Sequence, residues 1–149
     1  MQLPDAEIVF QNLAKQILSA DNKHFALVGI HTGGVWLAER LHQDMTGALP
    51  LGTLDVSFYR DDFDRIGLHA QVKLHTGRTI RAAINELFDY GRPASISLAT
   101  LVDRGGRELP IAAQYTGVEL AIPADKMLAL QREKSGRLSL VLHDKSLAE

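Results

Sequence analysis

The sequence predicts an α/β fold: an open, mostly parallel sheet with flanking helices and a small C-terminal β hairpin. Apolar runs of strand length alternate along the chain with stretches whose apolar residues recur at helical spacing, which is typical of such sheets. Near the C-terminus, two runs of alternating leucines flank a polar turn, which indicates an antiparallel hairpin. At 149 residues we expect one domain, residues 1–149, with its own hydrophobic core.

Composition excludes several classes of protein. Hydrophobic residues make up 46% and charged residues 23%, which is typical of a globular chain rather than a disordered one. The net charge of −2 gives no general attraction to nucleic acid. The chain has no cysteine, and its six histidines lack the spacing of metal ligands, so no metal site is predicted. Without a membrane-spanning run or an N-terminal signal pattern, we expect a cytoplasmic protein with no membrane partner.

The first half of the chain predicts helix, strand, helix and strand. Pro4 and Asp5 can begin a helix that ends near Asp21. The apolar run 25–30 predicts a parallel strand buried on both faces, and residues 53–59 alternate as a strand with two unlike faces. Between them, a second helix is expected to end at Gly47. The residues expected to face inward from the two helices are Ile8, Val9, Leu13, Ile17, Leu18, Leu37, Ala38, Leu41 and Met45.

The second half predicts a third helix and then strands. Residues 63–73 show no period and are expected to form a loop. The helix beginning at Thr79 should end at Gly91, and residues 95–102 predict another buried strand. Tyr115 marks a short strand, and leucines at 128, 130, 138, 140 and 142 predict the hairpin around a turn at 133–136. The residues expected to face inward from the helix are Ile80, Ala83, Ile84, Leu87 and Phe88.

Residues 76–79 form the loop most suited to an anion. Thr76 and Thr79 offer hydroxyls, Gly77 lets the backbone approach a ligand, and Arg78 adds positive charge. The helix that follows directs unpaired N–H groups and its positive dipole end at the same point, which suits phosphate. Taken alone, the pattern is more often that of an ordinary turn and helix cap than of a phosphate site. Three further polar loops, 31–34, 60–73 and 103–110, follow predicted strands, where open α/β sheets bind ligands.

Several motifs together resemble the PyrR family of type I phosphoribosyltransferases. Members of that family are both pyrimidine operon regulators and uracil phosphoribosyltransferases. The resemblance covers most of residues 3–123, and the Tyr-Arg-Asp-Asp segment at 59–62 is among its most specific parts. The matching stretches are residues 28–34, 37–41, 54–62, 76–83, 91–96 and 101–110.

The resemblance implies a reaction and a site. The reaction transfers ribose 5-phosphate from phosphoribosyl pyrophosphate (PRPP) to uracil, giving UMP and pyrophosphate, with Mg²⁺ bound to the substrate. A homodimer or higher homo-oligomer is also implied. Arg60 would have the catalytic role of neutralising pyrophosphate. The implied binding residues are Thr76, Gly77, Arg78 and Thr79 for the 5′-phosphate, Thr32, Gly33 and Gly34 for pyrophosphate, and Asp103, Arg104 and Leu120 for uracil or nucleotide.

The sequence departs from the family pattern before Thr76. Family members carry a buried apolar strand, two acidic residues and a short spacer there, whereas residues 71–75 lead directly into Thr76. Two explanations remain open: an internal deletion, or a join at Lys73 and Leu74 of residues that are not consecutive. The absent acidic pair makes a catalytically weak nucleotide-binding sensor one alternative. A UMP-dependent RNA-binding transcription attenuator is another, and it is not favoured because the N-terminal helix is not basic.

Three features also have structural explanations. Asp61 and Asp62 are expected to cap a loop as readily as to serve a site. Arg104 and Arg107 can pair with Glu108 instead of binding a ligand. Trp36 is expected to pack in the core or an interface.

Overall fold

The computed structural model describes residues 1–20, 25–45, 49–56, 70–71 and 76–145. The order of its elements follows the predicted order, with one additional short strand, β3. The elements are α1 (Ala6–Ser19), β1 (Leu27–Ile30), α2 (Gly33–Asp44), β2 (Leu51–Leu54), β3 (Ala70–Gln71), α3 (Arg78–Tyr90), β4 (Ala99–Asp103), β5 (Tyr115–Glu119), β6 (Lys126–Arg132) and β7 (Leu138–Asp144).

The strands form three separate sheets in the described part of the chain. β1 pairs with β2 and β4 pairs with β5, and both pairs are parallel. β3, β6 and β7 form an antiparallel sheet in that order. The fold is therefore mixed α/β, as predicted in class. The described residues contain parallel strand pairs rather than one continuous parallel sheet.

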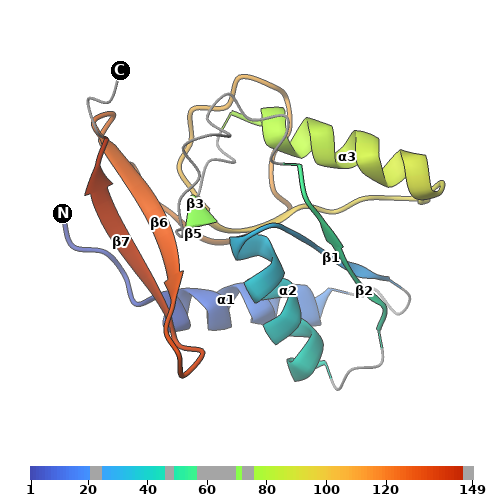
Figure 1. The fold of residues 1–149 in the computed structure, drawn as a ribbon, viewed down its shortest axis with the longest axis horizontal. Helices are drawn as coiled ribbons and strands as arrows, with labels where there is room; N and C mark the ends of the chain where they lie inside the picture. Colours follow the sequence, from blue (N-terminus) through green and yellow to red (C-terminus); the bar gives the residue numbers. More distant parts are fainter. Residues whose placement is uncertain (21–24, 46–48, 57–69, 72–75, 146–149) are drawn as a thin grey trace.

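The predicted C-terminal hairpin is confirmed. β6 and β7 pair along their whole length, from Lys126 opposite Asp144 to Arg132 opposite Leu138. The turn is closed by the hydrogen bond from Glu133 N to Arg137 O at 2.8 Å, and Gly136 takes a φ of 91° there. A left-handed residue in a tight hairpin turn favours glycine. Figure 1 shows this hairpin at one side of the molecule, with the N-terminus near it.

Helix α1 lies at the centre of the main core. Asp5 caps its N-terminus by accepting a hydrogen bond from Glu7 N, as expected of a helix start. Its buried face contacts β4, β5 and β7, and the same cluster includes Leu41 of α2. Val9, Leu13 and Ile17 are buried as predicted, but the prediction for Ile8 and Leu18 was wrong because both are exposed. These two side chains lie beside the apolar stripe rather than on it.

Helix α1 also approaches β5 closely. A Cβ added at Gly117 would lie 2.5 Å from Leu101 O and 2.7 Å from Val9 Cγ1, so this position accepts no side chain without movement. The side-chain amide of Gln16 donates to Thr116 O at 2.7 Å and accepts from Thr116 N at 3.4 Å. Asn12 donates to Gly117 O at 2.8 Å. Side chains of α1 thus form hydrogen bonds with backbone groups of β5.

Helix α3 is less buried than its pattern predicts. Ile80 and Ala83 are buried, and Ala83 packs with Leu54 and Val56 in a second, smaller cluster. Phe88, predicted to face inward, is 52% exposed, so that prediction was wrong. Figure 1 shows the reason: α3 lies along the opposite side of the molecule from α1, away from the main core.

Two predicted strands differ from the observed ones. The run 25–30 was expected to be buried on both faces, but Val28 of β1 is 40% exposed, so that prediction was wrong. The predicted strand 95–102 begins only at Ala99, and Ala99 is exposed. The strand predicted at 53–59 is observed as Leu51–Leu54. Three predicted features lie outside the described residues: Gly47, residues 57–69 and the Lys73–Leu74 junction.

No helix in the described ranges has both the length and the apolar content that a membrane crossing requires.

Trp36 is half-buried against the main core, and the Arg132 guanidinium lies 4.9 Å from its ring centroid. Its predicted packing role is confirmed.

Candidate functional site

The loop at 76–79 has the geometry of an anion-binding helix start. Gly77 occupies the N-cap position of α3 with a φ of 94°, a conformation that side chains other than glycine's rarely adopt. It has no side chain to cap the helix, so the first-turn N–H groups have no cap from that residue. Thr79 lies half-buried in the first turn, and Thr76 Oγ1 accepts a long 3.4 Å hydrogen bond from Arg78 N.

This loop is joined to the loop after β4. Thr76 O accepts hydrogen bonds from Glu108 N at 3.0 Å and Leu109 N at 3.1 Å. A Cβ at Gly77 would lie 3.2 Å from Leu109 Cβ, so the two loops also pack tightly. Two of the predicted site segments are therefore brought together, although they lie about thirty residues apart, as the Arg78–Glu108 separation of 30 shows.

The Arg78 side chain is held by Glu108. Its Nε and Nη2 donate to Glu108 Oε2 at 2.9 and 2.7 Å. The expected alternative pairing of Arg107 with Glu108 was wrong, because Arg107 instead donates to Asp103 Oδ2 at 2.7 Å. The Arg78 side chain is 72% exposed, so its pair with Glu108 is worth little and can give way to an incoming anion.

Asp103 folds the loop that follows β4. Its Oδ1 accepts from Gly105 N at 2.9 Å, and its backbone oxygen accepts from Leu120 N at 2.9 Å. The hydrogen bond from Gly105, aided by Arg107, lowers the pKa of the Asp103 carboxyl in spite of its partial burial. Asp103 is therefore ionised at neutral pH and committed to the loop. This geometry makes Asp103 a residue that positions the loop beside half-buried Leu120.

Arg104 follows Asp103 at the end of β4. Burial lowers the pKa of its guanidinium, which nevertheless stays cationic at neutral pH because the ordinary pKa of arginine lies far above neutrality. Arg104 thus places a half-buried positive charge next to the loop that Arg78 contacts. An anionic or carbonyl-rich ligand would find that charge favourable.

The loop predicted at 31–34 is shorter than expected, because α2 already begins at Gly33. Thr32 is the N-cap residue of α2 and makes no side-chain cap, while the peptide bond between His31 and Thr32 is cis. Gly29 allows a very close approach of this turn, since a Cβ there would lie 2.8 Å from Gly34 O and 2.7 Å from Val35 Cα. The start of α2, with Gly33 and Gly34, therefore lies directly against β1.

The structure brings the predicted loop at 31–34 near the helix that follows the 76–79 loop, but it does not describe Arg60. Ile30, just before the 31–34 loop, packs with α3 in the second cluster, so the starts of α2 and α3 belong to adjoining elements. Arg60, the predicted catalytic residue, and Asp61 and Asp62 lie outside the described residues. The role of Arg60 stays a prediction. Within the described ranges, no three His, Asp or Glu side chains gather in a way that could hold a metal ion.

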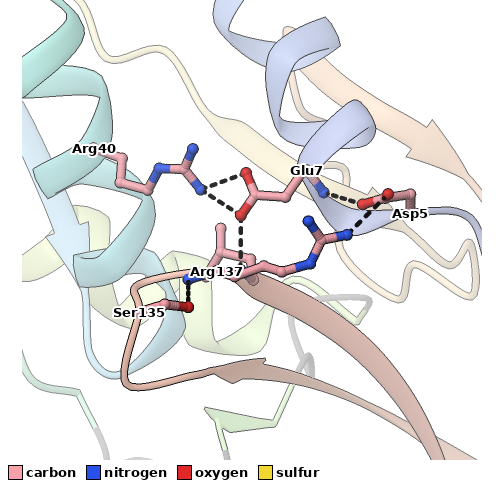
Figure 2. Close-up of polar contacts among 6 residues, drawn as sticks. Asp5, Glu7, Arg40, Ser135 and Arg137 are labelled. Carbon is pink, nitrogen blue, oxygen red and sulfur yellow. Dashed lines mark hydrogen bonds and ion pairs between the residues drawn. The ribbon is translucent and has the colours of Figure 1, made fainter.

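A charged cluster that the sequence did not reveal joins α1, α2 and the hairpin turn. Glu7 accepts from Arg40 Nη1 at 2.8 and 3.0 Å and from Leu138 N at 2.8 Å. Arg137 donates to Asp5 Oδ2 at 3.2 Å. Figure 2 shows Glu7 lying between Arg40 and the turn that carries Ser135 and Arg137. The cluster borders a shallow depression of about 460 Å³. Each of its carboxylates forms an ion pair with an arginine, so we interpret the cluster as a structural contact that holds α1, α2 and the hairpin together.

Replacing Glu7 by glutamine is expected to lower the free energy of unfolding by about 1–3 kcal/mol, because charged hydrogen bonds to Arg40 and Leu138 are lost. Burial raises the pKa of Glu7, but the Leu138 hydrogen bond and the Arg40 charge together lower that pKa below the ordinary value of a glutamate. The stabilisation is therefore present above the unfolded-state pKa and is lost as pH falls through the folded-state pKa. Urea unfolding between pH 3 and pH 7 measures it, with exposed Glu133→Gln as the control. A gap between the two variants that does not shrink in acid would contradict this account.

No protein-family model matches the chain. A protein named "Bifunctional protein PyrR" from Nitrosococcus oceani is 44% identical, over 83% of this chain and 84% of its own. One of the same name from Pseudomonas paraeruginosa is 51% identical, over 69% and 72% of the two chains. Another, from Pseudomonas savastanoi pv. phaseolicola, is 40% identical over 99% of both.

The last comparison bears on the departure before Thr76. Its alignment has 175 positions whereas this chain has 149 residues, so at least 26 positions (175 less 149) hold a residue of the relative alone. Because both chains are covered almost from end to end, these positions lie inside the chain. Lys73 and Leu74 are consecutive in the full sequence. An internal deletion and a join of residues that are not consecutive both predict these additional positions in the relative, and the Lys73–Leu74 junction lies outside the described residues.

Proposed function

The chain belongs to the PyrR family, and we propose that it is a uracil phosphoribosyltransferase that also regulates pyrimidine biosynthesis. Its reaction would join uracil to the ribose 5-phosphate of PRPP and release pyrophosphate. The observation that carries the proposal is the joined pair of loops at 76–79 and 103–110, in which a helix start with glycine at its N-cap position is hydrogen-bonded to a loop bearing Arg104. Helix starts of this kind bind phosphate.

Each part of the substrate has a suitable group. Thr76, Gly77, Arg78 and Thr79 would hold the 5′-phosphate through backbone N–H groups, hydroxyls and the Arg78 charge. Thr32, Gly33 and Gly34 would hold pyrophosphate at the start of α2, where the glycines expose the backbone. Mg²⁺ would enter bound to the pyrophosphate of PRPP. Asp103 would shape, and Arg104 and Leu120 would border, the uracil pocket, and Arg60 would neutralise the leaving pyrophosphate.

The same proposal includes the sheet. We infer that β1–β2 and β4–β5 are two parts of the open, mostly parallel sheet expected of a type I phosphoribosyltransferase. Support comes from α3, which packs on Ile30 and Leu54 while the loop before it bonds to Glu108 and Leu109. A homodimer or higher homo-oligomer is part of the proposal and is tested by sedimentation.

The direct test incubates the protein with uracil, PRPP and Mg²⁺ and measures the UMP formed by chromatography. Thermal protection by PRPP and by UMP is measured in parallel. Turnover supports the enzyme; protection without turnover supports the alternative of a catalytically weak nucleotide sensor. If PRPP and UMP give no thermal protection and no UMP is formed, the proposal is overturned. Tight, UMP-dependent binding of pyrimidine-operon leader RNA would instead favour the attenuator.

Replacing Arg78 by glutamine is expected to weaken UMP binding by about 10–100-fold, because a charge-assisted hydrogen bond to phosphate is worth roughly 1.5–3 kcal/mol. Calorimetric titration with UMP measures it. Glu108→Gln is the matched control: it removes the competing carboxylate from the same ion pair and should tighten UMP binding by about two- to fivefold. Equal losses in both variants would mean that the ion pair, rather than the Arg78 charge, matters.

A further inference from the structure

Helix α2 carries the proposed pyrophosphate residues in its first turn and contacts the rest of the chain further along. The first turn contains Gly33 and Gly34, and Gly29 of β1 lets it lie directly against that strand. Arg40 follows Gly33 by seven residues, which is about two helical turns or roughly 10 Å along the axis. Because a short helix moves as one rigid unit, a contact made by Arg40 also fixes the position of the first turn.

The Arg40 side chain connects α2 to α1. Its Nη1 donates to both carboxylate oxygens of Glu7, at 2.8 and 3.0 Å, and its guanidinium carbon lies 4.4 Å from the centroid of the Phe10 ring. Figure 2 shows this side chain extending from α2 toward Glu7. The side chains of Arg40 and Glu7 are 33% and 18% exposed, so water and salt screen their interaction less than that of a fully exposed pair.

The partner of Arg40 is itself held in place. Glu7 Oε1 also accepts a hydrogen bond from Leu138 N at 2.8 Å, which fixes the carboxylate against β7. On α1, Glu7 follows Ala6, which is 2% exposed, and it lies one turn before Phe10, which is 1% exposed. Arg40 therefore attaches α2 to a carboxylate that belongs to the main core and cannot move with α2.

A second contact supports the same helix more weakly. The Arg132 guanidinium of β6 lies 4.9 Å from the Trp36 ring centroid, and its Nη1 lies 3.6 Å from Glu39 Oε2. Both of these α2 residues precede Arg40, and the 3.6 Å separation is too long for a good hydrogen bond. The bonds from Arg40 to Glu7 are the shorter ones. Helix α2 is thus held between β1 and the pair formed by α1 and β6, and Arg40 makes its strongest polar contact there.

We propose that Arg40 is a positioning residue for pyrophosphate. By holding α2 against α1, it sets where Gly33 and Gly34 present their backbone N–H groups to the anion. The inference rests on the proposed function, because it takes the start of α2 as the pyrophosphate site. The groups proposed for the 5′-phosphate and for uracil lie on other elements, at the start of α3 and after β4. A shift of α2 should therefore weaken pyrophosphate binding and leave UMP binding unchanged.

Calorimetric titration of the Arg40→Gln variant tests the role. UMP is titrated first, and magnesium pyrophosphate is then titrated into protein saturated with UMP, so that the 5′-phosphate site is already occupied. The dissociation constant of pyrophosphate is expected to rise about three- to thirtyfold, less than the roughly hundredfold cost of a 1 Å misplacement at a reacting centre. That of UMP should stay within about twofold. A smaller folded fraction would weaken both ligands by the same factor, so the ratio separates positioning from destabilisation.

Two further variants serve as controls. Arg137→Gln removes an arginine of the same cluster that pairs with Asp5 and not with α2, so both dissociation constants should remain unchanged. Arg40→Lys keeps a cation beside Glu7. Because a single nitrogen makes both bonds to Glu7, the lysine ammonium can replace it in part, and most of the pyrophosphate affinity should return.

Hydrogen exchange of the ligand-free protein gives a readout of α2 itself. Amides in the first turn of α2 should exchange about threefold faster or more in Arg40→Gln, and at the original rate in Arg137→Gln. Unchanged exchange in both variants would mean that Arg40 does not fix this turn, and the inference would fail.

The titrations distinguish this inference from the proposed function. If Arg40→Gln weakens pyrophosphate and UMP equally, or if Arg137→Gln weakens pyrophosphate as much, Arg40 has no positioning role. If the unsubstituted protein binds UMP but no pyrophosphate, the start of α2 is not the pyrophosphate site and this inference alone fails. If it binds neither ligand, the proposed function fails and the inference fails with it.

Discussion

Replacing Gly29 by alanine is expected to lower the free energy of unfolding by about 1–3 kcal/mol and to weaken PRPP binding at the same time. The new Cβ would lie 2.7 Å from Val35 Cα and 2.8 Å from Gly34 O, and both are backbone atoms that cannot turn aside. The first turn of α2 would have to move away from β1. That turn carries Gly33 and Gly34, which we propose hold pyrophosphate.

Gly52→Ala is the matched control for this prediction. Gly52 lies opposite Val28 on the neighbouring strand, and a Cβ there would make an ordinary 4.0 Å contact with Val28 Cγ2. Urea unfolding and thermal protection by PRPP are measured for both variants. A Gly29 variant with the stability and PRPP response of the Gly52 variant would show that α2 does not depend on this close approach.

Replacing Phe10 by alanine is expected to cost about 3–5 kcal/mol of unfolding free energy, the usual loss for a large buried aromatic residue. Phe10 is 1% exposed in the main core, and Arg40 of α2 lies 4.4 Å from its ring centroid. Removal would leave a cavity beneath α1 and would also remove the surface on which Arg40 rests. Such a loss is a large part of a typical stability of about 5–15 kcal/mol.

Denaturant unfolding measures this loss, and Phe88→Ala is the control. Phe88 is 52% exposed on α3, so its replacement should change the unfolding free energy by no more than about 0.5 kcal/mol. If the two variants lost similar free energy, α1 would not be the centre of the core. If Phe10→Ala were neutral, the packing of α1 described above would be wrong.

Local patterns along the chain predicted a large part of this fold. The element order, the hairpin with its turn at 133–136 and the start of α3 to within one residue were each predicted from neighbouring residues. Spacing within one element encodes such features directly. The candidate loops could be identified for the same reason, because glycine, threonine and arginine beside a helix start are visible without any tertiary contact.

Burial and charge pairing were not predictable in this way. Ile8, Leu18 and Phe88 fit their helical patterns and are nevertheless exposed, since only packed elements decide which apolar residues are covered. Glu7 meets Arg40 across 33 residues and Arg78 meets Glu108 across 30, separations at which sequence spacing carries no geometric information. The role of Arg60 stays a prediction for this chain.

The sequence by itself determined the kinds of elements, their order and the loops that can bind an anion, because these follow from residues adjacent in the chain. Only the tertiary structure decided that Thr76 is bonded to the loop after β4 and that Asp103 folds that loop. It also decided that β1 and β4 lie in separate strand pairs. The physical reason is that a hydrogen bond or a strand pairing depends on which distant segment packs beside it, and residues adjacent in the chain do not encode that choice.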